Sequence, residues 1–248
     1  MKTYFVVADV HSFYDEMIAA LDGAGFDPAN PDHIFVCLGD LLDRGDKPLE
    51  CLDFVNRLPA DQKILIRGNH EDLLTECILR QYIGGRDRHN GTDKTLVALS
   101  GHTREEFFSG DYRPYITKAG DNPALKRYLF GLVDYFEIGD YVFVHGWVPR
   151  ASESPKRDWR LGNWYRARWE NGMDEWRQGV RPRGKTVVCG HWHASWGHAM
   201  LDKTSPEWGP AADFSPFSRP GILAIDACTA YSRKVNCVKL GIPDEKEG

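Results

Sequence analysis

Three apolar runs in the first seventy residues each end in a polar residue and are followed by a helical pattern. They are TYFVVAD (3–9), HIFVCLGD (33–40) and KILIRGNH (63–70). Short runs of β-branched and aromatic residues are typical of buried strands. A helix is predicted after each run. After the first run, apolar residues recur on one helix face. After the second, Pro48 is a favourable first helical residue, and after the third a helix is predicted over 71–82. The pattern predicts three strand–loop–helix units, with Phe13, Met17, Ile18 and Leu21 on one face of the first helix.

The rest of the chain adds further strand candidates and two polar segments. The run YFEIGDYVFVHG (135–146) predicts a hairpin that turns at Gly139 and Asp140, and KTVVCG (185–190) predicts another strand. Two final strands are predicted in GILAIDA (221–227) and KVNCVKL (234–240), after a loop that reaches about Pro220. We expect helices and loops in 84–120, inserted over a sheet. The pattern indicates one α/β domain over residues 1–248.

Polar residues at the ends of the strands carry the candidate chemistry. Asp9, Asp40 and Asn69 are 31 and 29 residues apart, which is the length of one βαβ unit. Consecutive units place such residues side by side at the carboxyl edge of a sheet, where α/β proteins bind ligands. His145 and His191 also follow strand-like runs directly. Five strands therefore deliver polar ligands toward one edge.

The number and type of these ligands predict two metal ions. Asp9 with His11, and His191 with His193, are pairs at i and i+2, which point the same way in an extended backbone. Imidazole, carboxylate and amide ligands without thiolate suit Mn, Fe, Zn or Ni. Seven ligands exceed one tetrahedral site and match two ions ~3.5–4 Å apart, with Asp40 as the bridge because its strand would lie between those of Asp9 and Asn69. The candidate ligands are Asp9, His11, Asp40, Asn69, His145, His191 and His193.

Five short motifs make the chain similar to a known superfamily. They are DVH (9–11), GDLLDRG (39–45), RGNHE (67–71), VHG (144–146) and GHWH (190–193). Their order resembles that of the calcineurin-like metallophosphoesterase superfamily, in particular its phosphoprotein phosphatase branch with the bacterial and phage serine/threonine phosphatases. The resemblance implies two packed mixed sheets flanked by helices, with a dinuclear site at the strand ends. The last two strands resemble the closing hairpin of that branch.

The resemblance also assigns roles to the ligands. It places Asp9, His11 and Asp40 on the first metal, and Asp40, Asn69, His145 and His191 on the second. His193 resembles a further ligand of the first metal in the wider superfamily, although the phosphatase branch usually lacks it. A water made acidic by two cations would become the attacking hydroxide.

Further residues are implied to handle the proton and the phosphate. His70 would protonate the leaving alkoxide, and Asp43 would orient its ring. Arg44 and Arg67 would hold phosphate oxygens, for which the guanidinium fork is suited. Arg166 resembles a third phosphate-binding arginine, with Arg160 and Arg168 as competitors. We expect Glu71 merely to begin a helix.

Composition adds one segment to this picture. The chain has 248 residues and a net charge of −5, yet all eight tryptophans lie between Trp147 and Trp208, where eleven basic residues meet seven acidic ones. We expect the cap, residues 147–185, to use its indoles mainly for packing. Contact with substrate by Trp147 or Trp192 is the alternative. The basic charge would attract phosphorylated substrates.

Charge and hydropathy exclude several classes of protein. The acidic total argues against a nucleic-acid binder. No run approaches the ~20 apolar residues of a membrane span, and the N-terminus lacks the core of a signal peptide, so we expect a cytoplasmic protein without a membrane partner. The six cysteines are scattered without a CxxC pair and are expected to be free thiols.

The function expected first is metal-dependent hydrolysis of phosphomonoesters, in the manner of a serine/threonine protein phosphatase. The cofactors would be two divalent ions, with manganese first, and the partner a phosphorylated protein, peptide or small phosphoester. The alternative is a dinucleoside polyphosphate hydrolase or a phosphodiesterase. A non-catalytic scaffold is the remote alternative.

Overall fold

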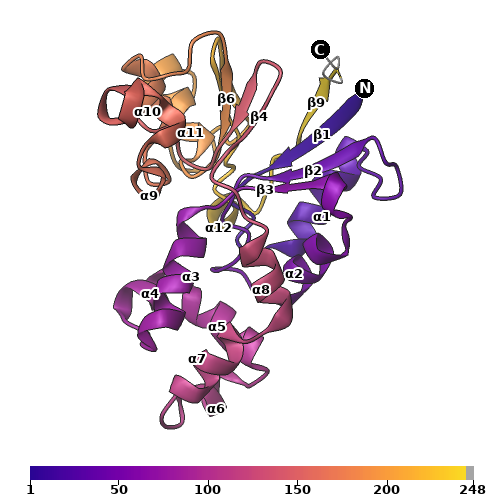
Figure 1. The fold of residues 1–248 in the computed structure, drawn as a ribbon, viewed down its shortest axis with the longest axis vertical. Helices are drawn as coiled ribbons and strands as arrows, with labels where there is room; N and C mark the ends of the chain where they lie inside the picture. Colours follow the sequence, from indigo (N-terminus) through magenta and orange to yellow (C-terminus); the bar gives the residue numbers. More distant parts are fainter. Residues whose placement is uncertain (244–248) are drawn as a thin grey trace.

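The computed structural model describes residues 1–243 and places their strands in two mixed sheets that pack face to face (Figure 1). The first sheet has the order β3-β2-β1-β9. β1, β2 and β3 are parallel, and β9 is antiparallel to β1. The parallel order with β2 in the middle is the one predicted from the spacing of the polar residues. The strands are β1 (Lys2–Val7), β2 (His33–Cys37), β3 (Lys63–Leu65) and β9 (Val238–Ile242).

The second sheet has the order β4-β5-β6-β8-β7, with parallel pairs between β5, β6 and β8. Its antiparallel pair β4–β5 is the hairpin expected at Gly139 and Asp140. The strands are β4 (Phe136–Ile138), β5 (Tyr141–Phe143), β6 (Thr186–Cys189), β7 (Phe217–Arg219) and β8 (Ile222–Ala224).

The predicted closing hairpin is wrong. β8 pairs with β6 and β7 in the second sheet, whereas β9 pairs with β1 at the edge of the first. The burial of the two strands explains the separation. β8 is largely buried between neighbours, whereas exposed and covered positions alternate along β9, as suits an edge strand. β7, which was expected to be loop, is the hairpin partner of β8.

Helices follow each of the first three strands, as predicted. They are α1 (Tyr14–Ala24), α2 (Pro48–Arg57) and α3 (Asn69–Arg80), with a single turn η1 (Ala60–Gln62) before β3. α3 begins two residues before the predicted start because the Glu71 carboxylate accepts a hydrogen bond from the backbone N–H of Gly68 at 2.8 Å and caps the helix there. It ends at Arg80 because Gln81 adopts a left-handed conformation, with φ 54°.

Residues 84–120 form helices that pack on other helices, not over a sheet as expected. α5 contacts α2, α3 and α7, so the segment extends the helical side of the first sheet into a lobe (Figure 1). The following helix, α8, which the pattern did not reveal, packs on α2. The helices are α4 (Gly85–Asn90), α5 (Thr92–Ser100), α6 (Arg104–Phe108), α7 (Arg113–Gly120) and α8 (Pro123–Phe130).

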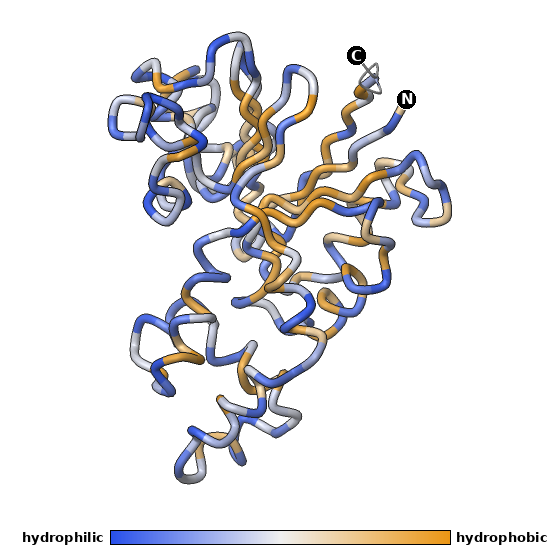
Figure 2. The backbone as a smooth tube through the Cα atoms, in the orientation of Figure 1, coloured by the Kyte–Doolittle hydropathy of each residue, from blue (hydrophilic) through white to orange (hydrophobic). Residues whose placement is uncertain are grey.

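The buried apolar residues form three layers. One layer lies between the sheets, where Tyr4 and Val36 of the first sheet meet Phe143 and Val188 of the second. A second layer joins the first sheet to its helices, and a third joins the second sheet to the cap. Figure 2 shows the hydrophobic positions concentrated along the strands. All six cysteines are free, as expected.

Single turns and short helices connect the strands that follow β5. Trp147 and Trp159 are buried in the layer beneath the second sheet, and Trp164, Trp176 and Trp196 pack against it. Among residues 1–243, no helix combines the length and apolar character needed to cross a membrane. The elements are η2 (Ala151–Glu153), η3 (Pro155–Arg157), η4 (Trp159–Leu161), α9 (Trp164–Ala167), α10 (Gly172–Arg177), α11 (Ala194–Trp196), η5 (Gly197–Asp202) and α12 (Thr229–Ser232).

Candidate active site

The ligands predicted from the sequence converge at the carboxyl ends of strands from both sheets. Most of them line one cavity of about 270 Å³, and all are buried or partly buried. The convergence follows from the topology, because parallel strands of each sheet end at the same edge. The residues are Asp9 and His11 after β1, Asp40 after β2, Asn69 at the start of α3, His145 after β5 and His191 after β6.

Asp40 lies between two groups of candidate metal ligands. Within residues 1–243, the ligand atoms of His11, Asp40 and His70 lie within 4.8 Å of one another, and so do those of Asp40, His145 and His191. Asp40 Oδ2 is 3.8 Å from His11 Nε2, whereas Asp40 Oδ1 is 3.4 Å from His145 Nε2. One carboxylate thus faces each group with a different oxygen. This donor set fits two divalent cations that share Asp40.

Asn69 extends the second group, and Asp9 lies beside it. Asn69 Oδ1 lies 2.8 Å from His145 Nε2, which places the amide oxygen with the second group. The Asp9 carboxylate lines the cavity and accepts a hydrogen bond from the backbone N–H of His191 at 2.9 Å. Asp9 therefore ties the first sheet to the second across the site.

Burial sets the protonation of these groups. It lowers the pKa of His11 and His145, and lowers that of His191 to about 3, which favours the neutral rings. Burial raises the pKa of Asp40, but the surrounding histidines outweigh it and hold the pKa below its usual range. Neutral imidazole and ionised carboxylate are the forms that bind metal.

The backbone at the ligands is left-handed, not extended as the paired spacing suggested. The φ angles are 51° at Asp9, 51° at His11, 53° at Asp40 and 64° at His191. Non-glycine residues adopt this conformation at an energetic cost, and such residues cluster at functional sites. Tight turns, instead of extended strands, aim these side chains into the cavity.

Two glycines allow the ligand loops to approach one another. A Cβ at Gly68 would collide with the Asp40 carboxylate, and a Cβ at Gly190 would collide with that of Asp9. The motifs RGNHE and GHWH therefore need glycine at these positions for close packing.

The structure places His70 beside Asp43, the two residues predicted to act as an acid pair. His70 Nδ1 lies 2.9 Å from Asp43 Oδ2, and both side chains are buried. The Asp43 carboxylate also accepts hydrogen bonds from the hydroxyls of Thr92, at 2.8 Å, and Thr95, at 2.7 Å. Burial lowers the pKa of His70, but the carboxylates of Asp40 and Asp43 outweigh it and raise the pKa. The two threonines belong to α5, and no sequence signal distinguished them.

Glu71 corrects an expectation. It does cap α3, but its buried carboxylate also accepts hydrogen bonds from the backbone N–H groups of Asp40, at 3.0 Å, and Leu41, at 3.1 Å. The hydroxyl of Tyr128 donates a further bond at 2.8 Å. Glu71 therefore holds the loop that carries Asp40. Its position in the motif RGNHE could have indicated a role beyond starting the helix.

Of the predicted phosphate-binding arginines, Arg44 lines the cavity. Its Nη2 lies 3.2 Å from His70 Nε2, beside the candidate acid. Arg67 lies outside the lining and donates to the backbone oxygen of Leu129 at 3.3 Å, with its Nη1 3.7 Å from Asp72.

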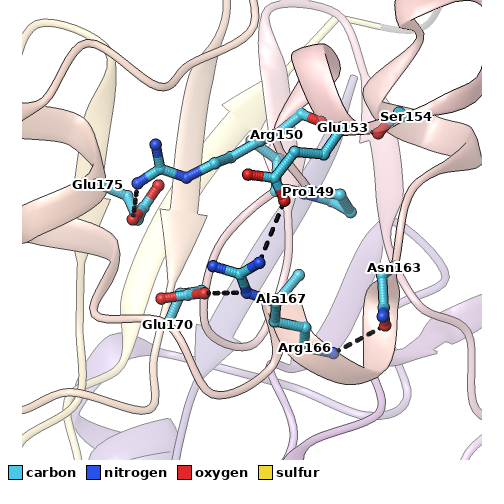
Figure 3. Close-up of a pocket in the computed structure, with 10 residues that line it drawn as sticks. Pro149, Arg150, Glu153, Ser154, Asn163, Arg166, Ala167, Glu170 and Glu175 are labelled. Atoms are coloured by element: carbon cyan, nitrogen blue, oxygen red, sulfur yellow. Dashed lines mark hydrogen bonds and ion pairs between the residues drawn. The ribbon is translucent and has the colours of Figure 1, made fainter.

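Arg166 does not reach the metal cavity. Asn163 caps α9 and directs Arg166 into a separate pocket of the cap, where its guanidinium pairs with Glu153 at 3.2 Å and Glu170 at 3.1 Å (Figure 3). The two competitors are engaged elsewhere. Arg168 pairs with Asp72 and Asp134 at 2.7 and 2.8 Å, and Arg160 pairs with Glu137 at 2.7 Å.

His193 lines the cavity but belongs to neither ligand group. Its Nδ1 lies 2.9 Å from the hydroxyl of Ser195, and its Nε2 lies 3.4 Å from the Glu207 carboxylate. Its ring centroid is 4.5 Å from that of Trp208. In this structure His193 joins the loop at Glu207 and Trp208 to the site, and its role as a ligand stays a prediction.

Asp226 is an acidic residue of the cavity that the sequence reasoning missed. It is buried, lines the cavity, and accepts a hydrogen bond from the Cys228 backbone N–H at 2.6 Å. Burial raises its pKa to about 7. Its position in the sequence could have identified it, because Asp226 follows strand β8 just as Asp9 follows strand β1.

The indoles near the site differ from those expected. Trp147 is fully buried and donates to the backbone oxygen of Val180, so it cannot contact substrate. Trp192 is exposed but lies outside the cavity lining. Trp169 and Trp208 line the cavity instead.

Comparison with known proteins identifies the family. The sequence model of the calcineurin-like phosphoesterases matches residues 2–214. The chain belongs to the calcineurin-like phosphoesterase family. The ordered motifs and the two-sheet fold of this phosphoesterase agree with that membership, and the predicted α/β fold class is confirmed.

The phosphoesterase resembles proteins of two kinds. The symmetrical bis(5'-nucleosyl)-tetraphosphatase of Histophilus somni (strain 2336) is 42% identical over 161 residues, which cover 65% of this chain and 47% of that protein. The tetraphosphatase of Actinobacillus succinogenes is 42% identical over 77 residues, which cover 31% of this chain and 26% of that protein. The chain thus spans about half or less of these relatives.

A solved structure of a mutant of a cold-active protein tyrosine phosphatase has a TM-score of 0.62 and 17% identity, covering 97% of this chain and 75% of that chain. At this low identity, the similarity to the protein tyrosine phosphatase concerns the fold alone.

Proposed function

We propose that this phosphoesterase hydrolyses dinucleoside tetraphosphates and releases two nucleoside diphosphates. The observation that carries the proposal is the 42% identity over 161 residues to a symmetrical bis(5'-nucleosyl)-tetraphosphatase. It reverses the order expected from the motifs, which put protein phosphatase first, because the protein phosphatase likeness rests on fold at 17% identity.

The residues of the cavity support hydrolysis of a phosphoanhydride. Two divalent cations, of which manganese is proposed first, would be held around Asp40 and would supply an acidic water and charge neutralisation. The Arg44 guanidinium would bind the phosphate oxygens. One oxygen–phosphorus bond forms with water, and the bond to the bridging oxygen of the departing nucleoside diphosphate breaks. His70 would give its proton to that oxygen.

The leaving group determines how much His70 contributes. A departing phosphate has a second pKa of about 6, so it needs little protonation at neutral pH. A serine alkoxide is a far stronger base and needs the proton. We therefore propose that a His70→Asn variant loses more activity on a phosphoserine peptide than on diadenosine tetraphosphate.

Serine/threonine phosphatase activity is the second candidate. The buried His70–Asp43 pair at 2.9 Å favours it, because a positioned acid is most useful to an alkoxide leaving group. A cytoplasmic location is proposed for either activity.

A substrate panel tests the proposal. Initial rates are measured with Mn²⁺ on diadenosine tetraphosphate, a phosphoserine peptide and bis-aryl phosphate, with the Asp40→Asn variant as the metal-site control. We expect diadenosine tetraphosphate to have the largest kcat/KM and ADP as its only product. Turnover of the peptide without diadenosine tetraphosphate would refute the proposal. Fewer than one bound ion per chain, or full turnover in Asp40→Asn, would contradict the dinuclear site.

A further inference from the structure

Two indoles line the metal cavity, and they differ in how open they are. Trp169 is partly buried, with the Arg86 guanidinium 5.3 Å from its ring centroid and the His191 ring edge-on at 6.0 Å. Trp208, in the loop between η5 and β7, is 48% exposed although it borders the ligands. The ring of Trp208 is thus open to solvent at the rim of the cavity, where it is available for stacking by a ligand.

Neighbouring groups hold Trp208 in place. Its ring centroid lies 4.5 Å from that of His193 and 5.3 Å from that of Tyr231, which meets it edge-on at 81°. The chain on each side is also fixed, because Ser195 donates to the Glu207 backbone oxygen at 2.9 Å and the Gly209 N–H donates to the Tyr231 hydroxyl at 3.2 Å. The indole is therefore positioned before any ligand binds.

Further space lies next to the loop that carries Trp208. A second cavity of about 550 Å³ begins at Gly209, directly after Trp208, and is lined by Tyr231 and Lys234. The metal cavity itself is smaller, at about 270 Å³, and its lining is dominated by charged and polar ligands. Trp208 thus lines the metal cavity and contacts Phe214 and Tyr231, which line the second cavity.

We propose that Trp208 is the platform on which a nucleobase of the substrate stacks while its phosphates lie at Asp40. This inference rests on the proposed function, since it assumes a nucleotide substrate. Stacking on an indole tolerates any base, because every base has a π-face. Trp208 thus favours nucleotides over peptides without distinguishing adenine from guanine strongly.

The test compares Trp208→Ala with Trp208→Phe, and uses Tyr165→Ala as the control, because Tyr165 is an exposed aromatic residue outside the cavity lining. The substrates are diadenosine tetraphosphate and inorganic tetrapolyphosphate, which has the anhydrides but no base. Trp208→Ala is expected to raise KM for diadenosine tetraphosphate about 10-fold and to leave KM for tetrapolyphosphate unchanged. Trp208→Phe should restore most of the affinity, and Tyr165→Ala should match the wild type.

A binding measurement separates this inference from the proposed function. Calorimetric titration of ADP into the Mn²⁺-loaded protein should give a Kd about 10-fold weaker for Trp208→Ala than for wild type. Equal ADP affinity, with equal KM for diadenosine tetraphosphate, would overturn the platform while leaving the activity intact. A wild type that cannot cleave diadenosine tetraphosphate would refute the activity, and ADP binding would still decide the platform. A larger effect of Trp208→Ala on a phosphopeptide than on diadenosine tetraphosphate would also overturn it.

Discussion

Glu71 offers the sharpest test of how the site is held together, because one buried carboxylate organises the loop that carries Asp40. It accepts hydrogen bonds from the N–H groups of Asp40, Leu41 and Gly68 and from the Tyr128 hydroxyl, at 2.8 to 3.1 Å. The variant Glu71→Gln keeps the shape of the side chain but replaces one acceptor oxygen with an NH₂ group. We expect this change to destabilise the fold and to weaken metal binding.

The expected loss of stability in Glu71→Gln follows from the groups that donate hydrogen bonds to this carboxylate. If the NH₂ group faces Asp40 and Gly68, two buried N–H groups lose their acceptor. If it faces Leu41 and Tyr128, the hydroxyl can turn to accept, but the Leu41 N–H is still orphaned. An orphaned buried donor costs about 1–3 kcal/mol, so we expect a loss of about 2 kcal/mol in the free energy of unfolding. Displacement of Asp40 should lower metal affinity about 10- to 100-fold.

Urea unfolding of the metal-free protein measures the first effect, and calorimetric titration with Mn²⁺ measures the second. Both are done at pH 8, because burial and the charge of Asp40 raise the pKa of Glu71 to about 7 and the carboxylate must be ionised. The control is Tyr128→Phe, which removes one donor and leaves the three N–H bonds, for a loss of about 1 kcal/mol. The reasoning is refuted if Glu71→Gln matches wild type in both measurements, or costs no more than Tyr128→Phe.

Three further outcomes are expected. Asp43→Asn removes a carboxylate that raises the pKa of His70. Because His70 acts while protonated, the alkaline limb of the pH profile of kcat/KM on a phosphoserine peptide should move to lower pH. An unchanged alkaline limb would contradict the acid pair. Gly190→Ala should reduce Mn²⁺ affinity at least 10-fold, since its Cβ collides with Asp9, whereas Gly23→Ala, with open space around it, should bind metal like wild type in the same titration. Removal of metal with EDTA should lower the melting temperature measured by calorimetry, because metal binds the folded state selectively; an unchanged melting temperature would argue against a metal site.

Local patterns in the sequence were enough to predict every strand except β7, the first three helices and the edge at which the ligands meet. Asp9, Asp40 and Asn69 could be placed side by side because the chain length between them matched one βαβ unit, and the parallel pairing of β1, β2 and β3 follows that arithmetic. The partnership of His70 with Asp43 could be inferred because both lie in motifs whose order matched a known superfamily.

Other parts of the site could not be read from the chain because they depend on residues far apart in sequence. Thr92 and Thr95 are ordinary helix residues until α5 packs against the Asp43 turn, 52 residues from Thr95. Arg166 follows the expected Trp–Tyr–Arg pattern, but the carboxylates that surround it lie in the cap and turn it away from the cavity.

The sequence by itself determined the fold class and the family and supplied the candidate metal ligands, because these depend on residue identity and on the spacing and order of short motifs. Only the tertiary structure decided which strand pairs with which at the sheet edges, that Glu71 braces the Asp40 loop, and that Trp208 and not Trp147 borders the site. The physical reason is that burial, and the donors a side chain meets there, are set by packing between distant segments. Packing between distant segments cannot be predicted from the local pattern of the sequence.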